Sequence, residues 1–205
     1  MFLPSSLPFP RMRAGRAGMA LPTPRYEHLG PRGPFRDVYE PAEDTFLLLD
    51  ALERDAGSLR EARVEICLEI GSGSGVVSTF LASSILGPSA LYICTDINPM
   101  AAYCTQETAL LNNVHLQPII TDLVKSHGIE ASWAGGKQGR EVMDRVFPLV
   151  PDLLSPGGLF YLVTIKENNP DEILETMKKS GLKGTQILSR QAGQEMLTIL
   201  RFRKS

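Results

Sequence analysis

The sequence predicts an α/β fold in which helices cover both faces of one mainly parallel sheet. Strand-like and helix-like segments alternate from Val38 to the C-terminus. The strand-like segments are apolar at successive positions, a pattern typical of strands that are buried on both faces. A length of 205 residues with 43% hydrophobic residues suits a single domain with a substantial core.

The first half contains helix, strand, helix, strand, helix and strand in that order. The first helix is expected in YEPAEDTFLLLDALERDA, because Pro41 fits a first helical position and acids follow it. The third is expected in NPMAAYCTQETALLNN, where Asn98 is a suitable N-cap and Pro99 follows it. The other segments, in chain order, are the strand VEICLEI, the helix GVVSTFLASSIL, and the strands ALYICTDI and QPIITD.

The second half adds three strands and two helices. GREVMDRVFPLVPDLL has a helical pattern, and NPDEILETMKKSG is a helix that Gly181 closes. The strands are GLFYLVTI, KGTQILS and EMLTILRF.

Residues 1–35 have a different composition, rich in Pro, Gly and Arg and without a hydrophobic period. Such a segment buries too little apolar surface to offset its ordering entropy, so we expect a disordered extension before a domain at 36–205. Three arginines and no acid in the first 20 residues weakly resemble a transit peptide, although the prolines argue against an amphipathic helix. Met19 is an alternative start.

Cysteines and charge limit the function classes. Cys67, Cys94 and Cys104 are odd in number, lie in apolar segments and form no CxxC pair, so we expect reduced buried thiols and a protein of the cytoplasm and nucleus. No metal site is expected. The net charge of −2 disfavours nucleic acid as a partner, and no apolar run reaches the roughly 20 residues of a membrane span. The three histidines have no partner at ligand spacing, so a surface or structural role is expected for each: His28, His115 and His127.

The segment LEIGSGSGVV resembles a nucleotide-binding loop between a strand and a helix. Gly71 and Gly73 fit the dinucleotide pattern GxGxxG, but Val76 occupies its third glycine position and Gly75 makes GxGxG instead. Glu69 ends the preceding strand, where a carboxylate would repel a pyrophosphate and would attract a cationic or hydroxyl-bearing ligand. A phosphate-rich cofactor is therefore disfavoured.

Two further acids end the next two strands. Asp96 is placed to accept hydrogen bonds from a ribose diol, and Asp122 to accept from the amine of adenine. Three acids at three consecutive strand ends favour an adenosyl ligand without phosphates.

Many segments of the chain, taken in order, resemble the HemK-type S-adenosylmethionine (SAM)-dependent methyltransferases. They are YEPAEDTFLLLDAL, EICLEIGSGSGVVS, LYICTDINP, ITDLVK, ASWAGG, GREVMDR and FYLVTIKENNP. The resemblance is greatest to the eukaryotic branch that methylates a glutamine of the translation release factor and that was also described as adenine-specific DNA methyltransferases. It implies a class I, Rossmann-like sheet of six parallel strands and one antiparallel strand. It also implies a heterodimer with a small zinc-binding activator. The implied SAM contacts are Thr45, Glu69, Gly71, Asp96, Asp122 and Leu123.

The family's catalytic motif, NPPY, is absent from this chain. In the family its Asn side chain and a proline carbonyl accept both hydrogens of the substrate nitrogen, which aims the nitrogen lone pair at the methyl group. The nearest string, NNPD from Asn168, more plausibly starts a helix, so no catalytic residue is assigned.

The pattern also lacks one strand. Only one helix-like segment lies between Asp122 and Gly158, where a doubly wound sheet needs a further central strand beside the glycine-loop strand. We place the seam at Lys125 to Ser126, as if a block of sequence had been skipped.

Three functions stay open at this stage. The first is a shortened SAM-dependent methyltransferase, catalytically impaired, with a release-factor glutamine, a histone lysine or adenine as the family's substrate. The second is a non-catalytic protein that binds SAM or the family's partner. The third, disfavoured by Val76, is an NAD-dependent oxidoreductase. If the activator adds a strand at QPIITD, Ile119 and Ile120 lie at that contact.

Overall fold

The computed structural model describes residues 20–122 and 140–205. The first range contains α1 (Glu43–Arg54), α2 (Ala56–Glu61), β1 (Ile66–Ile70), α3 (Val76–Phe80), β2 (Leu91–Asp96), α4 (Pro99–Leu111) and β3 (Gln117–Ile120). The second contains α6 (Glu141–Val146), α7 (Val150–Leu153), β4 (Leu159–Ile165), α8 (Pro170–Lys179), β5 (Leu182–Ala192) and β6 (Glu195–Lys204). Each predicted strand is present.

Helix boundaries follow local chemistry, with two corrections. Asn98 caps α4 as predicted, because its Oδ1 accepts from the Met100 amide at 2.9 Å. Pro41 does not open α1: residue 42 is still extended and the helix begins at Glu43. The predicted helix GREVMDRVFPLVPDLL is divided into α6 and α7, because Pro148 has no amide hydrogen to continue the ladder.

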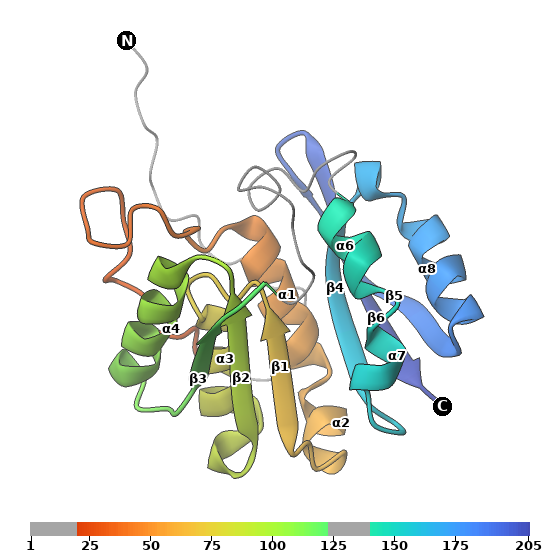
Figure 1. The fold of residues 1–205 in the computed structure, drawn as a ribbon, viewed down its shortest axis with the longest axis horizontal. Coiled ribbons are helices and arrows are strands. Elements are labelled where there is room, and N and C mark those ends of the chain that lie inside the picture. The colour runs from red at the N-terminus through yellow and green to blue at the C-terminus, as the bar shows by residue number, and fades with distance from the viewer. Residues whose placement is uncertain (1–19, 123–139) are drawn as a thin grey trace.

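The first half builds a parallel sheet in the order β1-β2-β3, with α3 and α4 on one face (Figure 1). Tyr92 and Cys94 of β2 are buried against Ala109 of α4 on that face. The opposite face is apolar but exposed: Ile66, Leu68, Ile70, Leu91 and Ile119 are each 37–62% accessible. The predicted α/β class with a parallel sheet and helices is confirmed, although the described helices leave the second face of this sheet exposed.

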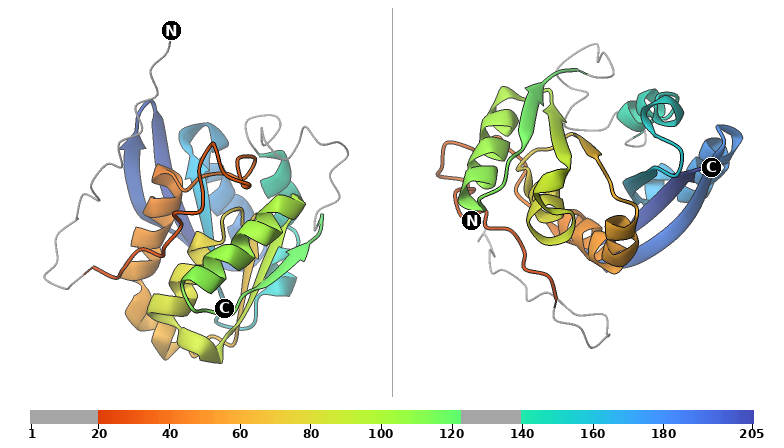
Figure 2. Two further views of the ribbon diagram at one scale, coloured as in Figure 1. Left: turned by 90° about the vertical axis from the view of Figure 1, so that its left-hand side faces the viewer. Right: turned by 90° about the horizontal axis from the view of Figure 1, so that it is seen from below.

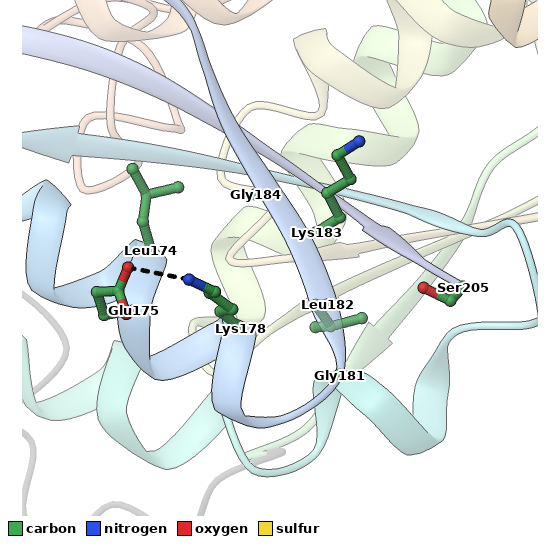
Figure 3. A pocket seen from close by; sticks show the side chains of 8 residues that line it. All are labelled: Leu174, Glu175, Lys178, Gly181, Leu182, Lys183, Gly184 and Ser205. Carbon is green, nitrogen blue, oxygen red and sulfur yellow. Dashed lines mark ion pairs between the residues drawn. The ribbon is translucent and has the colours of Figure 1, made fainter.

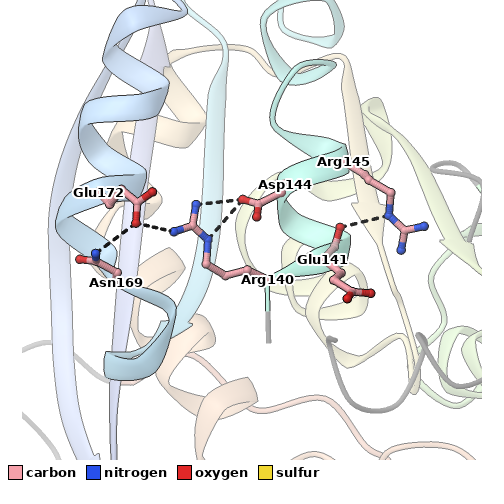
Figure 4. Close-up of polar contacts among 6 residues, drawn as sticks. All are labelled: Arg140, Glu141, Asp144, Arg145, Asn169 and Glu172. Carbon is pink, nitrogen blue, oxygen red and sulfur yellow. Dashed lines mark hydrogen bonds and ion pairs between the residues drawn. The ribbon is translucent and has the colours of Figure 1, made fainter. Parts of the chain in front are cut away.

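The second half builds an antiparallel sheet in the order β4-β6-β5. Here β6 runs antiparallel to both β4 and β5, and the family resemblance implied one antiparallel strand. Helices α6, α7 and α8 pack on this sheet around a core that includes Ile173, Met177, Leu200 and Phe202. The nearly buried Arg140 guanidinium joins α6 to α8, with hydrogen bonds of 2.9 Å to Asp144 and 2.8 Å to Glu172 (Figure 4).

The two sheets are not joined by backbone pairing among the described residues. β1 pairs only with β2, and β4 pairs only with β6. The Glu65 carbonyl accepts from Leu91 and the Gly71 amide donates to the Thr95 carbonyl, so odd-numbered residues of β1 pair with β2. The backbone groups of its even-numbered residues therefore point toward the unpaired edge. This division confirms that a central strand is missing from the described sheet.

Helix α1 links the two halves. Leu49 and Leu52 pack with α3, whereas Leu47 and Ala51 pack with Leu197 and Ile199 of β6. Figure 2 shows α1 and α2 between the two sheets when the molecule is seen from below. This one amphipathic helix therefore contributes side chains to a hydrophobic cluster on each side.

Residues 20–35 pack against the domain, in contrast to the expected disordered extension up to residue 35. Leu21 and Tyr26 contact the core beside α1, and Phe35 is 8% exposed. The Arg25 amide donates to Asn112 Oδ1 at 2.7 Å, and Asn112 Nδ2 donates back to the Arg25 carbonyl at 2.8 Å. The composition of residues 1–35 gave no sign of these few apolar contacts. Residues 1–19 lie outside the described range.

The described residues also bear on the thiols, metals and membranes. Cys94 and Cys104 are buried and Cys67 is partly buried, all as free thiols, which agrees with the prediction. Burial raises the pKa of Cys67 to about 11 and that of Cys94 to about 12. In residues 20–122 and 140–205 no cluster of potential metal ligands is found. No described helix is long and apolar enough to cross a membrane.

Candidate functional site

The glycine loop lies at the carboxyl ends of β1 and β2. The amides of Gly71 and Ser72 both donate to the Thr95 carbonyl of β2, at 2.8 and 3.0 Å. These bonds fold the loop across the top of the parallel sheet, which is where ligands bind in open α/β folds.

Gly75 explains why the motif is GxGxG. Its φ of +74° is left-handed, and a Cβ there would lie 2.8 Å from the Cα and Cγ2 of Thr105. The loop and α4 thus approach each other closely at position 75, one residue before the third glycine of the dinucleotide pattern. Val76 is instead the first residue of α3 and is buried in the core.

Asp96 has a fixed carboxylate at the end of β2. Its Oδ2 accepts from the Gly73 amide and its Oδ1 accepts from the Asn98 amide, both at 2.9 Å. Each oxygen retains a lone pair, since a carboxylate oxygen can accept two hydrogen bonds. The arrangement fits the predicted acceptor of a ribose diol and also ties the loop to β2.

Glu69 lies on the helix side of the sheet. Its Oε2 accepts from the Ser78 amide at 3.2 Å and from the Ser78 hydroxyl, so Glu69 caps α3 in place of the missing side chain of Gly75. Burial raises the pKa of Glu69 to about 7, and the nearby charge of Asp96 adds to the rise. A cationic ligand group beside Oε1 would stabilise the ionised form.

The other predicted contacts are less well defined. Asp122 is partly buried just beyond β3, beside Thr121, whose amide donates to the Asp96 carbonyl at 2.9 Å. Thr45 lies in the first turn of α1, where its hydroxyl contacts Asp44 Oδ1 at 3.3 Å. Leu123 falls outside the described residues. Contacts of Thr95 with Glu69 and Gly71, and of Asp96 with the loop, therefore bring Glu69, Gly71 and Asp96 together, and the SAM contacts of all six residues stay predictions.

The charge around the loop suits SAM better than a dinucleotide. Residues 64–124 contain no Lys or Arg, so no side chain of this stretch can neutralise a pyrophosphate. SAM instead carries an ammonium group, a sulfonium, a diol and an adenine amine, which match half-buried carboxylates. The residues present thus fit SAM: Glu69 would face its cationic end and Asp96 its ribose.

NNPD does not replace the absent catalytic motif. Asn168 is 3% exposed and its Oδ1 accepts from the Ile165 amide at 2.8 Å. Asn169 precedes α8, which begins at Pro170, and its Nδ2 donates to Glu172 at 3.1 Å. The string forms the start of a helix, as predicted.

Sequence reasoning missed the residues behind the loop. Thr105 donates to the Gly73 carbonyl at 3.3 Å, and Thr108 donates to the Ser74 carbonyl at 2.6 Å. Their spacing of three places both side chains on one face of α4, a signal that becomes meaningful only when the packing of that face is known.

A hollow lies between α8 and the start of β5, away from the glycine loop (Figure 3). It is lined by Leu174, Gly184 and the ion pair of Lys178 with Glu175 at 3.7 Å. These groups offer no chemistry for methyl transfer, so the loop at the carboxyl ends of β1 and β2 is the better candidate.

Comparison with known proteins agrees with this assignment. A protein-family model described as "Ribosomal protein L11 methyltransferase (PrmA)" matches residues 43–196. The chain is 64% identical over 217 residues to the "Methyltransferase HEMK2" of Homo sapiens, covering 92% of this chain and 100% of that protein. Since 92% of 205 residues is about 189, about 28 of the 217 aligned positions have no residue in this chain.

Two other similar proteins are named for the eRF1 methyltransferase. The "eRF1 methyltransferase catalytic subunit mtq2" of Schizosaccharomyces pombe is 34% identical over 82% of this chain and 89% of that protein. The second is a chain of the solved E. cuniculi Mtq2-Trm112 complex, which is described as responsible for methylation of the eRF1 translation termination factor. That chain matches with a TM-score of 0.62 and 27% identity, over 82% of this chain and 99% of its own length. Together with the SAM-compatible loop, these matches show that the chain belongs to the HemK-type SAM-dependent methyltransferases.

Proposed function

We propose that this chain is a shortened form of the methyltransferase that modifies a glutamine of the translation release factor. In this form SAM binding is retained in part and methyl transfer is impaired. The similar proteins named for eRF1 support the substrate. The proposed location is the cytoplasm and nucleus, and it is supported by the free cysteines of this chain.

The main observation behind the proposal is that β1 and β4 each have one unpaired edge among the described strands. The family's NPPY motif follows the strand that belongs between them. About 28 aligned positions of the human relative have no counterpart here, enough for one strand with its connections. The strand and the motif would then have been lost together.

The remaining residues support binding but not alignment of a substrate. SAM supplies the methyl group when bound, and Glu69, Gly71 and Asp96 hold its polar groups. A glutamine amide nitrogen needs acceptors for both hydrogens so that its lone pair points at the methyl group. In the described residues, the one candidate string uses Asn168 Oδ1 internally.

The exposed edge of β3 supports the proposed activator as the partner. The similar E. cuniculi protein was solved together with Trm112. β3 pairs only with β2 among the described strands, and Ile119 and Ile120 are 44% and 54% exposed. A small zinc-binding activator could add a strand at this edge by backbone hydrogen bonds.

The test measures binding and turnover separately. Titration calorimetry with SAM should give weak binding by the parent chain and none by Asp96→Ala. Methyl transfer to release factor, with the activator present, should be undetectable for the parent. Grafting a family segment with a strand and NPPY between Lys125 and Ser126 should restore transfer, and the same graft with the motif's Asn changed to Ala should not.

Two results would contradict the proposal. Equal SAM affinity of the parent and Asp96→Ala would show that this carboxylate does not serve the cofactor. Robust methylation by the parent would show that other residues align the substrate. Parallel assays on a histone and on adenine-containing DNA assign the substrate class of the grafted protein.

A non-catalytic role is the second candidate, because the β3 edge is present although the catalytic motif is not. Such a protein would bind the activator and compete with the full-length enzyme. Inhibition of full-length activity by excess parent chain, relieved by added activator, would support it.

A further inference from the structure

His28 contacts α4 on the helix face that supports the glycine loop. Its Nε2 lies 3.1 Å from Thr108 Oγ1 and 3.5 Å from Cys104 Sγ. The imidazole and the Phe35 ring meet in a T-shaped contact, with the centroids 5.5 Å apart and the planes at 87°. The imidazole is therefore held in one orientation although it comes from a segment that composition alone marks as disordered.

The hydrogen bonds of Thr108 define which ring nitrogen carries the proton. The hydroxyl has one hydrogen, and two carbonyls lie within reach: that of Ser74 at 2.6 Å and that of Cys104 at 3.0 Å. A carbonyl can only accept, so the Thr108 hydroxyl donates to one of them and accepts from His28. Nε2 is then the donor. Nδ1 is buried, with no hydrogen-bond partner among the described residues.

This series of hydrogen bonds, from His28 through Thr108, ends on the backbone of the cofactor loop. Thr108 is fully buried, and its shorter carbonyl contact is to Ser74, the residue before Gly75. A hydroxyl that accepts one hydrogen bond donates a stronger one, because the two bonds polarise each other. His28 thus strengthens the bond that turns the Ser74 carbonyl toward α4 and away from the ligand side.

We propose that His28 is a positioning residue of the SAM site, which acts through Thr108 on the Ser74 carbonyl and so sets the affinity of the loop for the cofactor. This inference rests on the proposed retention of SAM binding. It gives the segment before α1 a role in cofactor binding, whereas the loop motif itself lies more than 40 residues later in the chain.

SAM affinity tests the relay through a double-mutant cycle. His28→Leu removes the donor and should weaken SAM binding about 2- to 10-fold, the range expected for one hydrogen bond. His28→Gln keeps an N–H donor and should remain within about twofold of the parent. Thr108→Val should weaken binding as well, and His28→Leu should add nothing in that background. His115→Leu, an exposed histidine beyond α4, is the matched control.

Two measurements need no SAM. Hydrogen exchange of the amides at 71–77 should be faster in His28→Leu than in the parent and in His28→Gln. The ¹⁵N shifts of the His28 ring should identify Nε2 as the protonated nitrogen. If the parent binds no SAM, the retained-cofactor proposal fails, while these two measurements still decide the role of His28. Additive effects in the cycle, unchanged loop exchange in His28→Leu, or a proton on Nδ1 would each overturn the relay.

Discussion

The Tyr161 hydroxyl of β4 donates a hydrogen bond of 2.7 Å to Asp55 Oδ2, between α1 and α2. Arg201 of β6 donates to the same oxygen at 2.8 Å. Asp55 is 9% exposed, so this shared acceptor is a largely buried polar link between the α1–α2 junction and the antiparallel sheet.

Tyr161→Phe should lower the free energy of unfolding by about 0.5 to 1.5 kcal/mol, because it removes one hydrogen bond and leaves Arg201 on Asp55. Asp55→Ala should cost more, since it leaves both donors without their acceptor. Urea denaturation measures both. Tyr39→Phe is the control, because the Tyr39 hydroxyl bonds Asp44 at 3.1 Å on the exposed surface. Equal losses for the two tyrosine variants would contradict the link.

Gly75→Ala should weaken both folding and SAM binding. The added Cβ would lie 2.8 Å from Thr105 Cα, and the φ of +74° adds strain, so the loop or α4 must move. Gly193→Ala provides the comparison, since φ there is +59° but no atom lies within 4 Å of the new Cβ. A thermal melt and a SAM titration of both variants separate the two contributions. Similar behaviour of the two variants would show that the contact with Thr105 is unimportant.

The raised pKa of Glu69 predicts a pH dependence with a definite sign. A folded-state pKa of about 7, above the ordinary value of 4.5, means that the folded protein binds this proton more tightly than the unfolded chain. The resulting stability is fully present below pH 4.5 and is lost as the pH rises through about 7.

Glu69→Gln, which does not titrate, should remove this component of the pH dependence. Unfolding free energies at pH 5 and pH 8 should differ less in the variant than in the parent. SAM binding should weaken as the pH falls below about 7, because protonation removes the charge that meets the cationic end. The same pH dependence in both proteins would assign the effect to other groups.

Ile120→Asp should weaken binding of the activator, since it places a charge at the exposed end of the edge strand β3. Pull-down after co-expression measures the loss. Leu153→Asp, a comparable change at a 54% exposed position on α7, should leave binding intact. Retention of the activator by Ile120→Asp would place the interface elsewhere.

The strands could be predicted from sequence because each is an apolar run bounded by turn residues. The cofactor loop was predictable as well, since Gly71, Gly73 and Gly75 follow a strand and precede a helix. The ordering of residues 20–35 was not, because a few contacts such as those of His28 and Phe35 depend on the face presented by α4. The break at Pro148 was missed because the apolar spacing on both sides of it continues a helical pattern.

The absence of Lys and Arg from residues 64–124 has a kinetic consequence. This stretch carries five acids, so its formal charge is −5, and the rest of the chain, with 21 basic and 18 acidic residues, is +3. SAM has a net positive charge at neutral pH, and the demethylated product has lost the sulfonium charge. The negative field of residues 64–124 therefore accelerates the association of SAM and favours binding of SAM over binding of the demethylated product. Added salt should slow the association of SAM, because it screens that field.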